Sequence, residues 1–264
     1  MRPSLTTLLL AVVSLAACSK PDPSAQARQA GNVLFKKGEF EKAGAEYEEA
    51  IGLEAPPQAK SYETAAFAYL KAGNLTKATE LLVKALELKP DTASKLETYR
   101  NITGMYLQAN RGAEAEKYFQ AILTLAPKDA AAMGWLAEIA SDRGGARNQL
   151  KPAVVSELER ALEWYAKVLE VTPDDVGPWV NRRIIYVKLA DAYAGQKAQA
   201  EADAEANKQD PETARDFTQQ AADAQAKLDD VQRRLAEANQ KIGALNRAKA
   251  TAGKQEPDRE RTPP

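Results

Sequence analysis

Apolar residues recur at helical spacing along most of the chain, in blocks that follow one another at a nearly fixed interval. The interval is clearest around Gly73, because Gly38 lies 35 residues before it and Asn110 lies 37 residues after it. Small and bulky residues keep the same register in each block, as at Ala78 and Leu82. Each block predicts two helices joined by a turn, since glycine and asparagine tolerate the positive φ that often ends a helix.

The fourth block is longer than the others. Its second helix starts late after Gly144, which indicates an insertion over residues 145–156. We expect Pro152 to be an early residue of a lengthened helix, because proline is tolerated in the first turn. The loop from Gly144 to Lys151 is expected to project from the array.

The pattern resembles the tetratricopeptide repeat, a unit of about 34 residues that forms two antiparallel helices. The first helix of each block carries two large residues seven positions apart, as at Tyr62 and Tyr69 or Tyr99 and Tyr106. The resemblance implies an all-α fold, a right-handed solenoid of helical hairpins over residues 27–193. The units fall near 24–57, 59–92, 96–129 and 130–175, with a partial fifth at 176–193.

After Tyr186 the repeat pattern is lost, while the helical composition continues to Lys208. From Glu212 the apolar residues follow an unbroken 3,4 spacing that is typical of a helix packed on another helix. We interpret residues 194–250 as an alanine-rich helical hairpin or coiled coil, whose region 212–250 could form a homo-oligomer. A single solvated helix is the alternative. Residues 251–264 have almost nothing apolar to bury and are expected to be disordered.

The N-terminus predicts a targeting signal. Arg2 precedes an apolar run from Leu5 to Leu15, which is shorter than the roughly 18 residues of a membrane-spanning helix. The run ends in Leu-Ala-Ala-Cys at Cys18, which resembles the lipobox of bacterial lipoproteins. The resemblance implies that residues 1–17 are removed and that Cys18 is acylated, with residues 18–26 as a tether. An ordinary secretory signal with a coincidental cysteine is the alternative.

Acylated Cys18 would hold the protein to a lipid bilayer, because several acyl chains together give stable anchoring. Ser19 follows the cysteine in place of the aspartate associated with inner-membrane retention in some bacteria. We therefore expect a position on the periplasmic face of the outer membrane, with the outer leaflet of the inner membrane as the alternative.

The amino-acid composition excludes several kinds of catalytic and metal-binding site. The chain has 36 Lys and Arg against 37 Asp and Glu, so no overall charge favours nucleic acid as a partner. It contains no histidine and a single cysteine, which excludes histidine-based catalysis and zinc sites built from His or Cys. We expect no enzyme activity, no cofactor and no metal.

Protein binding is the better hypothesis, because stacked helical hairpins line a concave groove with side chains of their first helices. Trp135 and Phe67 are large apolar groups on a face with no obvious core to fill. We expect envelope proteins or their peptide segments as partners; a structural spacer that acts through the C-terminal helices is the alternative. The candidate groove residues are Arg28, Asn32, Lys36, Thr64, Phe67, Lys71, Arg100, Asn101, Trp135, Glu138, Asn181 and Lys188.

Overall fold

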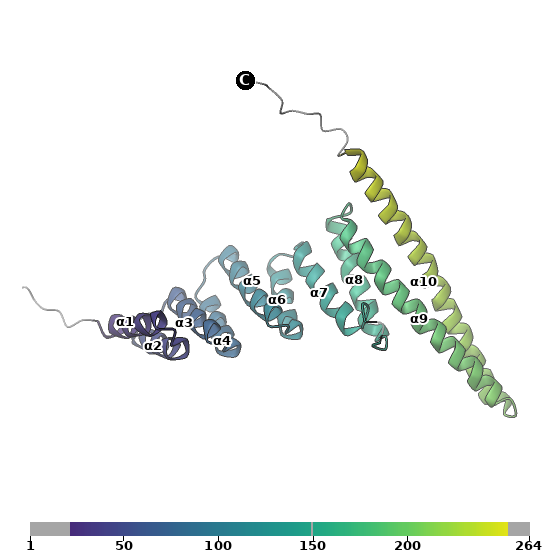
Figure 1. The fold of residues 1–264 in the computed structure, drawn as a ribbon, viewed down its shortest axis with the longest axis horizontal. Helices are drawn as coiled ribbons and strands as arrows, with labels where there is room; N and C mark the ends of the chain where they lie inside the picture. Colours follow the sequence, from purple (N-terminus) through teal and green to yellow (C-terminus); the bar gives the residue numbers. More distant parts are fainter. Residues whose placement is uncertain (1–21, 149, 253–264) are drawn as a thin grey trace, which may run out of the picture. The chain divides into compact units, whose positions relative to one another are not determined.

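The computed structural model describes residues 22–148 and 150–252. Over these residues the fold is all-α, with ten helices and no strand, which confirms the predicted fold class (Figure 1). The chain divides into two compact units, Met1–Pro90 and Asp91–Pro264. The signal at residues 1–17, Cys18 and residues 253–264 lie outside the described residues.

The first unit consists of two helical hairpins. Glycines join the helices of each hairpin with a positive φ of 81° at Gly38 and 80° at Gly73, as the sequence predicts. The helices are α1 (Pro23–Lys36), α2 (Phe40–Leu53), α3 (Ala59–Lys71) and α4 (Leu75–Glu87).

Two further glycines in this unit lie beneath tyrosine rings. A Cβ atom at Gly31 would lie 2.6 Å from the Tyr47 ring, and one at Gly44 would lie 2.8 Å from the Tyr69 ring. Both tyrosines are almost fully buried. Their rings therefore fill the seams between helices because the opposing positions carry no side chain.

The second unit contains three hairpins. Asn110 forms the α5–α6 turn with a φ of 56°, which confirms asparagine in the role that glycine has elsewhere. The helices are α5 (Thr92–Gln108), α6 (Gly112–Leu125), α7 (Ala130–Arg143), α8 (Val155–Val171), α9 (Val176–Ala206) and α10 (Pro211–Ala252).

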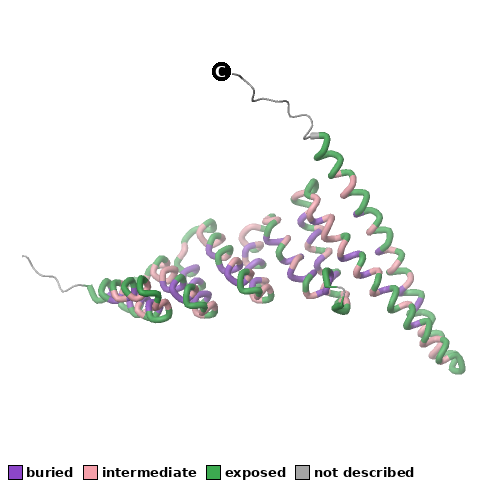
Figure 2. The backbone as a smooth tube through the Cα atoms, viewed as in Figure 1, coloured by how far each residue is buried: buried purple, intermediate pink, exposed green. Residues whose placement is uncertain are grey.

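The last hairpin pairs α9 with α10, which lie side by side (Figure 1). Asp210 caps α10, because its side chain accepts a hydrogen bond from the Glu212 backbone amide at 3.2 Å. The predicted apolar stripe of α10 faces inward, and its most buried members are Ala221, Ala224, Val231 and Ala238. Most other positions of α10 are exposed (Figure 2).

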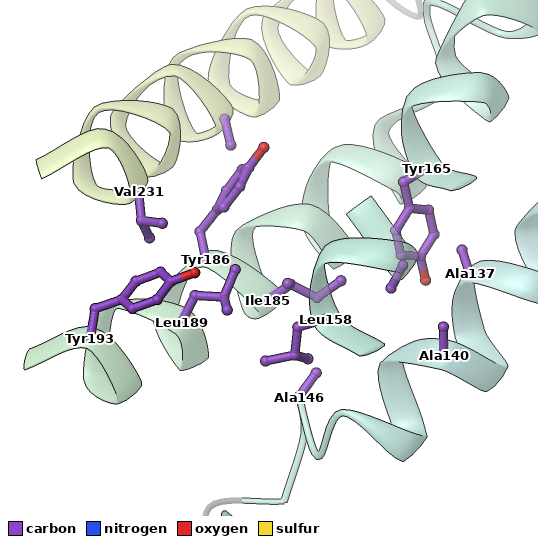
Figure 3. Close-up of a cluster of buried hydrophobic side chains, with 12 residues drawn as sticks. Ala137, Ala140, Ala146, Leu158, Tyr165, Ile185, Tyr186, Leu189, Tyr193 and Val231 are labelled. Atoms are coloured by element: carbon purple, nitrogen blue, oxygen red, sulfur yellow. The ribbon is translucent and has the colours of Figure 1, made fainter. Parts of the chain in front are cut away.

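One cluster of buried apolar side chains joins this hairpin to the preceding one. Tyr186 and Leu189 of α9 lie between Leu158 of α8 and Val231 of α10 (Figure 3). The stripe of α10 is thus occupied within the same chain as far as Ala238. Because α9 is one continuous helix, the boundary that the sequence placed between residues 193 and 194 falls inside it.

Two predicted boundaries are wrong by a few residues. The tether was expected to reach residue 26, but α1 begins at Pro23. Asp22 starts the helix early, because its carboxylate accepts a hydrogen bond from the Ser24 amide at 3.1 Å and proline suits the first turn. At the other end, Thr251 is still helical, although the sequence placed it in a disordered tail.

The inserted segment also differs from its prediction. Pro152 precedes α8, because Val154 bonds back to the carbonyl of Gly144 at 3.2 Å and holds the chain extended there. The loop does not project freely: Ala146 is buried, and Lys151 Nζ donates to the carbonyls of Asp142 and Arg143 at 3.2 and 2.9 Å. Lys151 therefore holds the loop against the C-terminal end of α7 through these carbonyls.

Candidate protein-binding faces

The first candidate face lies on α1 and α3, the leading helices of the first two hairpins. Its centre is Phe67, whose ring is 48% exposed and stacks on Phe35 with centroids 5.7 Å apart. Lys71 places its ammonium group 5.3 Å from the Phe67 ring centroid. We call Phe35, Lys36, Phe67 and Lys71 the aromatic-lysine face.

The charge of this face is not neutralised locally. Lys36 and Lys71 are exposed, and no carboxylate among the described residues lies within ion-pair distance of either ammonium group. An exposed aromatic ring with Lys71 over it, and with Lys36 next in sequence to its stacking partner Phe35, suits a ligand segment that combines an apolar side chain with acidic groups.

Three other candidates in this unit make contacts within the chain. Arg28 forms an ion pair with Glu54, whose side chain is almost fully buried, with a nitrogen to oxygen distance of 2.6 Å. Asn32 accepts a hydrogen bond from the Tyr47 hydroxyl at 2.8 Å, and Thr64 donates to the Lys60 carbonyl at 2.9 Å. The Arg28 and Asn32 contacts support the packing of α1 on α2, whereas the Thr64 bond lies within α3.

In the second unit, Trp135 of α7 is the exposed aromatic group. Its side chain is 45% exposed and stacks on Phe119 of α6, with centroids 6.2 Å apart. Arg100 pairs at 2.8 Å with Asp129, the residue that caps α7. Asn101 is exposed beside it on α5. Trp135 therefore offers one ring face to a ligand, while Arg100 supports the start of α7.

Glu138 and Asn181, both predicted to face the groove, bind each other. Asn181 Nδ2 donates to Glu138 Oε1 at 2.7 Å, and Arg147 Nη1 donates to Glu138 Oε2 at 2.6 Å. The Tyr165 hydroxyl donates to the same carboxylate. The Glu138 cluster, made of these four residues, joins α7, α8 and α9 to the inserted loop.

The Glu138 carboxylate is stabilised in its charged form by the donors around it. Burial alone would raise the pKa of Glu138, but hydrogen bonds from Arg147 and Tyr165 and the Arg147 charge outweigh burial and hold that pKa below its usual range. Burial and the Glu138 carboxylate raise the pKa of Tyr165. Since every acceptor of Glu138 has a donor, a ligand would have to break a formed contact to use it.

Lys188 also has an internal role. Its ammonium group donates to the backbone carbonyls of Asn148 and Lys151, at 3.0 and 2.7 Å. It therefore ties the inserted loop to α9. Of the candidates in this unit, Trp135 and Asn101 remain open to solvent without such a contact.

Sequence reasoning missed two residues. Phe35 belongs to the aromatic-lysine face, and its position one residue before the predicted Lys36 on α1 was the available signal. Arg147 reaches Glu138 from the inserted loop. No pattern in the sequence fixes how a loop folds back, because its partners Glu138 and Asn181 come from two other helices.

The sequence matches the tetratricopeptide repeat family over residues 29–56 and 59–92. These two matches cover the hairpins α1–α2 and α3–α4. These two hairpins are thus similar to tetratricopeptide repeats, which stack to form extended concave surfaces. No curated protein matches the chain.

Solved structures resemble the chain at low sequence identity. A structure of MamA protein has 15% identity and a TM-score of 0.45, covering 92% of this chain and 99% of its own. A TPR repeats protein from Bacteroides fragilis has 14% identity and a TM-score of 0.46, covering 86% and 99%. YrrB, described as a TPR protein with an unusual peptide-binding site, has 19% identity and a TM-score of 0.37, covering 78% and 89%.

Over residues 22–148 and 150–252, no helix is long and apolar enough to cross a membrane. Across the same stretches, no group of three or more His, Cys, Asp or Glu side chains is arranged to hold a metal ion.

Proposed function

We propose that this protein is a non-catalytic scaffold that binds a segment of a partner protein through the aromatic-lysine face. The observation that carries the proposal is the half-exposed Phe67 ring, which stacks on Phe35 and has the Lys71 ammonium group 5.3 Å from its centroid. Aromatic anchors fixed by packing bind with little loss of conformational entropy. The ligand is a segment with an apolar side chain next to acidic residues.

We further propose that acylated Cys18 tethers the scaffold to the periplasmic face of the bacterial outer membrane. The support is the lipobox-like sequence that ends at Cys18. Anchoring would confine binding to proteins of the envelope and raise the local concentration of the scaffold there. The proposed task is to assist the assembly or stability of an envelope complex.

A structural spacer is the second candidate function, and the C-terminal hairpin supports it. α10 has 42 residues and α9 has 31, so α10 extends about 11 residues, roughly 16 Å, past its partner. Ile242 and Leu245 in that extension are only partly buried. This part of α10 is available for pairing with a second copy of the chain.

Photo-crosslinking in cells tests the proposed function. A photoreactive amino acid at position 67 should crosslink to one defined partner, whereas the same group at Val83, an exposed apolar residue of α4, should not. Equal crosslinking from both positions would contradict a specific role of the aromatic-lysine face. Replacing Cys18 with serine should release the protein from membranes and abolish labelling with an alkyne fatty acid; retention of both would contradict the anchor.

A further inference from the structure

A cleft in the second unit lies outside the candidate faces described above. α8 and α10 both pack on α9, and between them the structure leaves a cleft of about 660 Å³. The lining residues of α9 form one stripe along that helix, from Arg182 through Tyr186 and Leu189 to Tyr193. Its volume falls in the range of roughly 300 to 1,000 Å³ that is usual for ligand sites.

Arg182 is the unusual residue of this cleft. Its guanidinium group lies 4.7 Å from the Trp179 ring centroid and 5.7 Å from that of Tyr186, and Nη2 donates to the Tyr186 hydroxyl at 2.8 Å. Its Nε atom is buried without a hydrogen-bond partner. Among the described residues, no carboxylate lies within ion-pair distance of Arg182. The group is thus held in place while part of its donor capacity is unused.

A second arginine approaches the same tyrosine from α10. Asp230 is hydrogen-bonded to Arg234 at 2.7 Å and raises its pKa, with a smaller contribution from Tyr186. Asp230 therefore neutralises Arg234, but nothing comparable neutralises Arg182. Arg182 is only partly buried, but its Nε atom is a buried donor without a partner, and such an atom is costly to leave unsatisfied.

We propose that this cleft binds a monocarboxylate with an apolar body, and that Arg182 donates to its carboxylate. Guanidinium groups suit this task because their planar donors match the two oxygens of a carboxylate. Leu162 and Ala166 of α8 and Ala226 of α10 supply apolar surface for the rest of the ligand.

The opposite wall sets the charge of the ligand. Glu159 and Glu163 of α8 line the cleft across from α10, and Glu159 is fixed by a hydrogen bond from Tyr193 at 3.1 Å. Lys227 of α10 also lines the cleft, 5.7 Å from the Tyr193 ring centroid. The two carboxylates of α8 repel a ligand with several negative charges more strongly than a ligand with one carboxylate. The site is independent of the aromatic-lysine face and of its proposed partner.

An NMR titration of the purified protein tests the proposal with N-acetyl-L-phenylalanine as the probe. The acid should shift backbone amides around Arg182 and Arg234 in a saturable way, and its uncharged amide and citrate should not, up to about 10 mM. Equal binding of acid and amide, or no saturable shift at the cleft, would overturn the proposal.

Variants identify the recognising group. Arg182→Gln should weaken binding about tenfold or more, because a charge-assisted contact is lost. Arg183→Gln, an exposed neighbour outside the cleft, should bind like the parent. If Arg182→Gln fails to fold by circular dichroism, Arg182→Lys serves instead and should weaken binding at least about threefold, because lysine keeps the charge but lacks the planar paired donors. Parent-like affinity in the folded cleft variant would overturn the proposal.

Titration with a peptide distinguishes two possible sources of the carboxylate, a polypeptide C-terminus and a free small molecule. A hexapeptide that ends in a free phenylalanine carboxylate is compared with the same peptide as its amide. Binding of the acid alone would support the proposal and identify a polypeptide C-terminus as the ligand. Binding of N-acetyl-L-phenylalanine without binding of either peptide would support a free small molecule.

Discussion

Asn181 of α9 donates a 2.7 Å hydrogen bond to Glu138 of α7, although the two residues are 43 positions apart in the chain. Both were predicted to face a ligand. Their contact, together with Arg147 and Tyr165, instead joins three helices and the inserted loop. The polar positions of this face thus divide into those that hold the fold and those that remain open to a partner.

Glu138→Gln should lower the free energy of unfolding by about 1–3 kcal/mol, because a glutamine amide would point a donor at the Arg147 donors and leave buried groups unsatisfied. Urea denaturation followed by circular dichroism measures the loss. Glu170→Gln, an exposed position of α8 with no ion pair, is the matched control and should be neutral. Equal stability of the two variants would contradict a structural role for the Glu138 cluster.

The cluster also predicts a pH dependence. The folded-state pKa of Glu138 lies below its ordinary value, so the unfolded chain binds a proton more readily than the folded chain. The stabilisation is therefore complete at neutral pH and is lost as the pH falls through the folded-state pKa. The stability difference between the parent and Glu138→Gln should shrink between pH 7 and pH 3 in urea titrations. A difference that stays constant or grows in acid would be inconsistent with this sign.

Gly44 and Gly52 lie on the same helix and should respond oppositely to alanine. A Cβ at Gly44 would lie 2.8 Å from the Tyr69 ring, and the Tyr69 hydroxyl is held by Glu48 at 2.7 Å. Gly44→Ala should therefore cost about 1–3 kcal/mol through overpacking. Nothing lies within 4 Å of a Cβ at Gly52, so Gly52→Ala should be neutral or stabilising by up to about 1 kcal/mol. Thermal denaturation of both variants checks the order, and a reversed order would refute the packing explanation.

The inserted loop should loosen when Lys188 is replaced. Lys188→Ala removes two hydrogen bonds to the carbonyls of Asn148 and Lys151, so amide hydrogen exchange over residues 145–151 should accelerate several-fold. Lys197→Ala, which removes only an exposed ion pair with Glu201 on the same helix, should leave that exchange unchanged. Hydrogen-exchange mass spectrometry compares the two. Parent-like exchange in Lys188→Ala would mean that Arg147 and Lys151 suffice to hold the loop.

The sequence predicts well where local chemistry decides the structure. Gly38, Gly73 and Asn110 form the expected turns, because few residues accept their positive φ. Phe67 and Trp135 are each about half exposed, and each stacks on an aromatic ring of another helix. These features depend on spacing within one hairpin or between neighbouring hairpins.

The sequence pattern did not predict contacts between residues that are far apart in the chain. The repeat pattern places Glu138 and Asn181 on one face but contains no signal that Arg147 folds back between them. The same holds for Arg234 of α10, whose approach to Tyr186 of α9 depends on how α10 returns along α9. The packing of the helices decides which partner such a side chain meets. A periodic pattern predicts only which side of a helix faces its neighbours.

The most direct test of the scaffold hypothesis is the dissociation constant of the crosslinked partner segment, measured by calorimetry on three proteins. Phe67→Ala should weaken binding at least about tenfold, because anchor residues carry most of the energy of an interface, while the melting temperature changes little. Val83→Ala, an exposed apolar control on α4, should bind like the parent. Parent-like affinity in a folded Phe67→Ala protein would contradict the central claim that the aromatic-lysine face binds the partner.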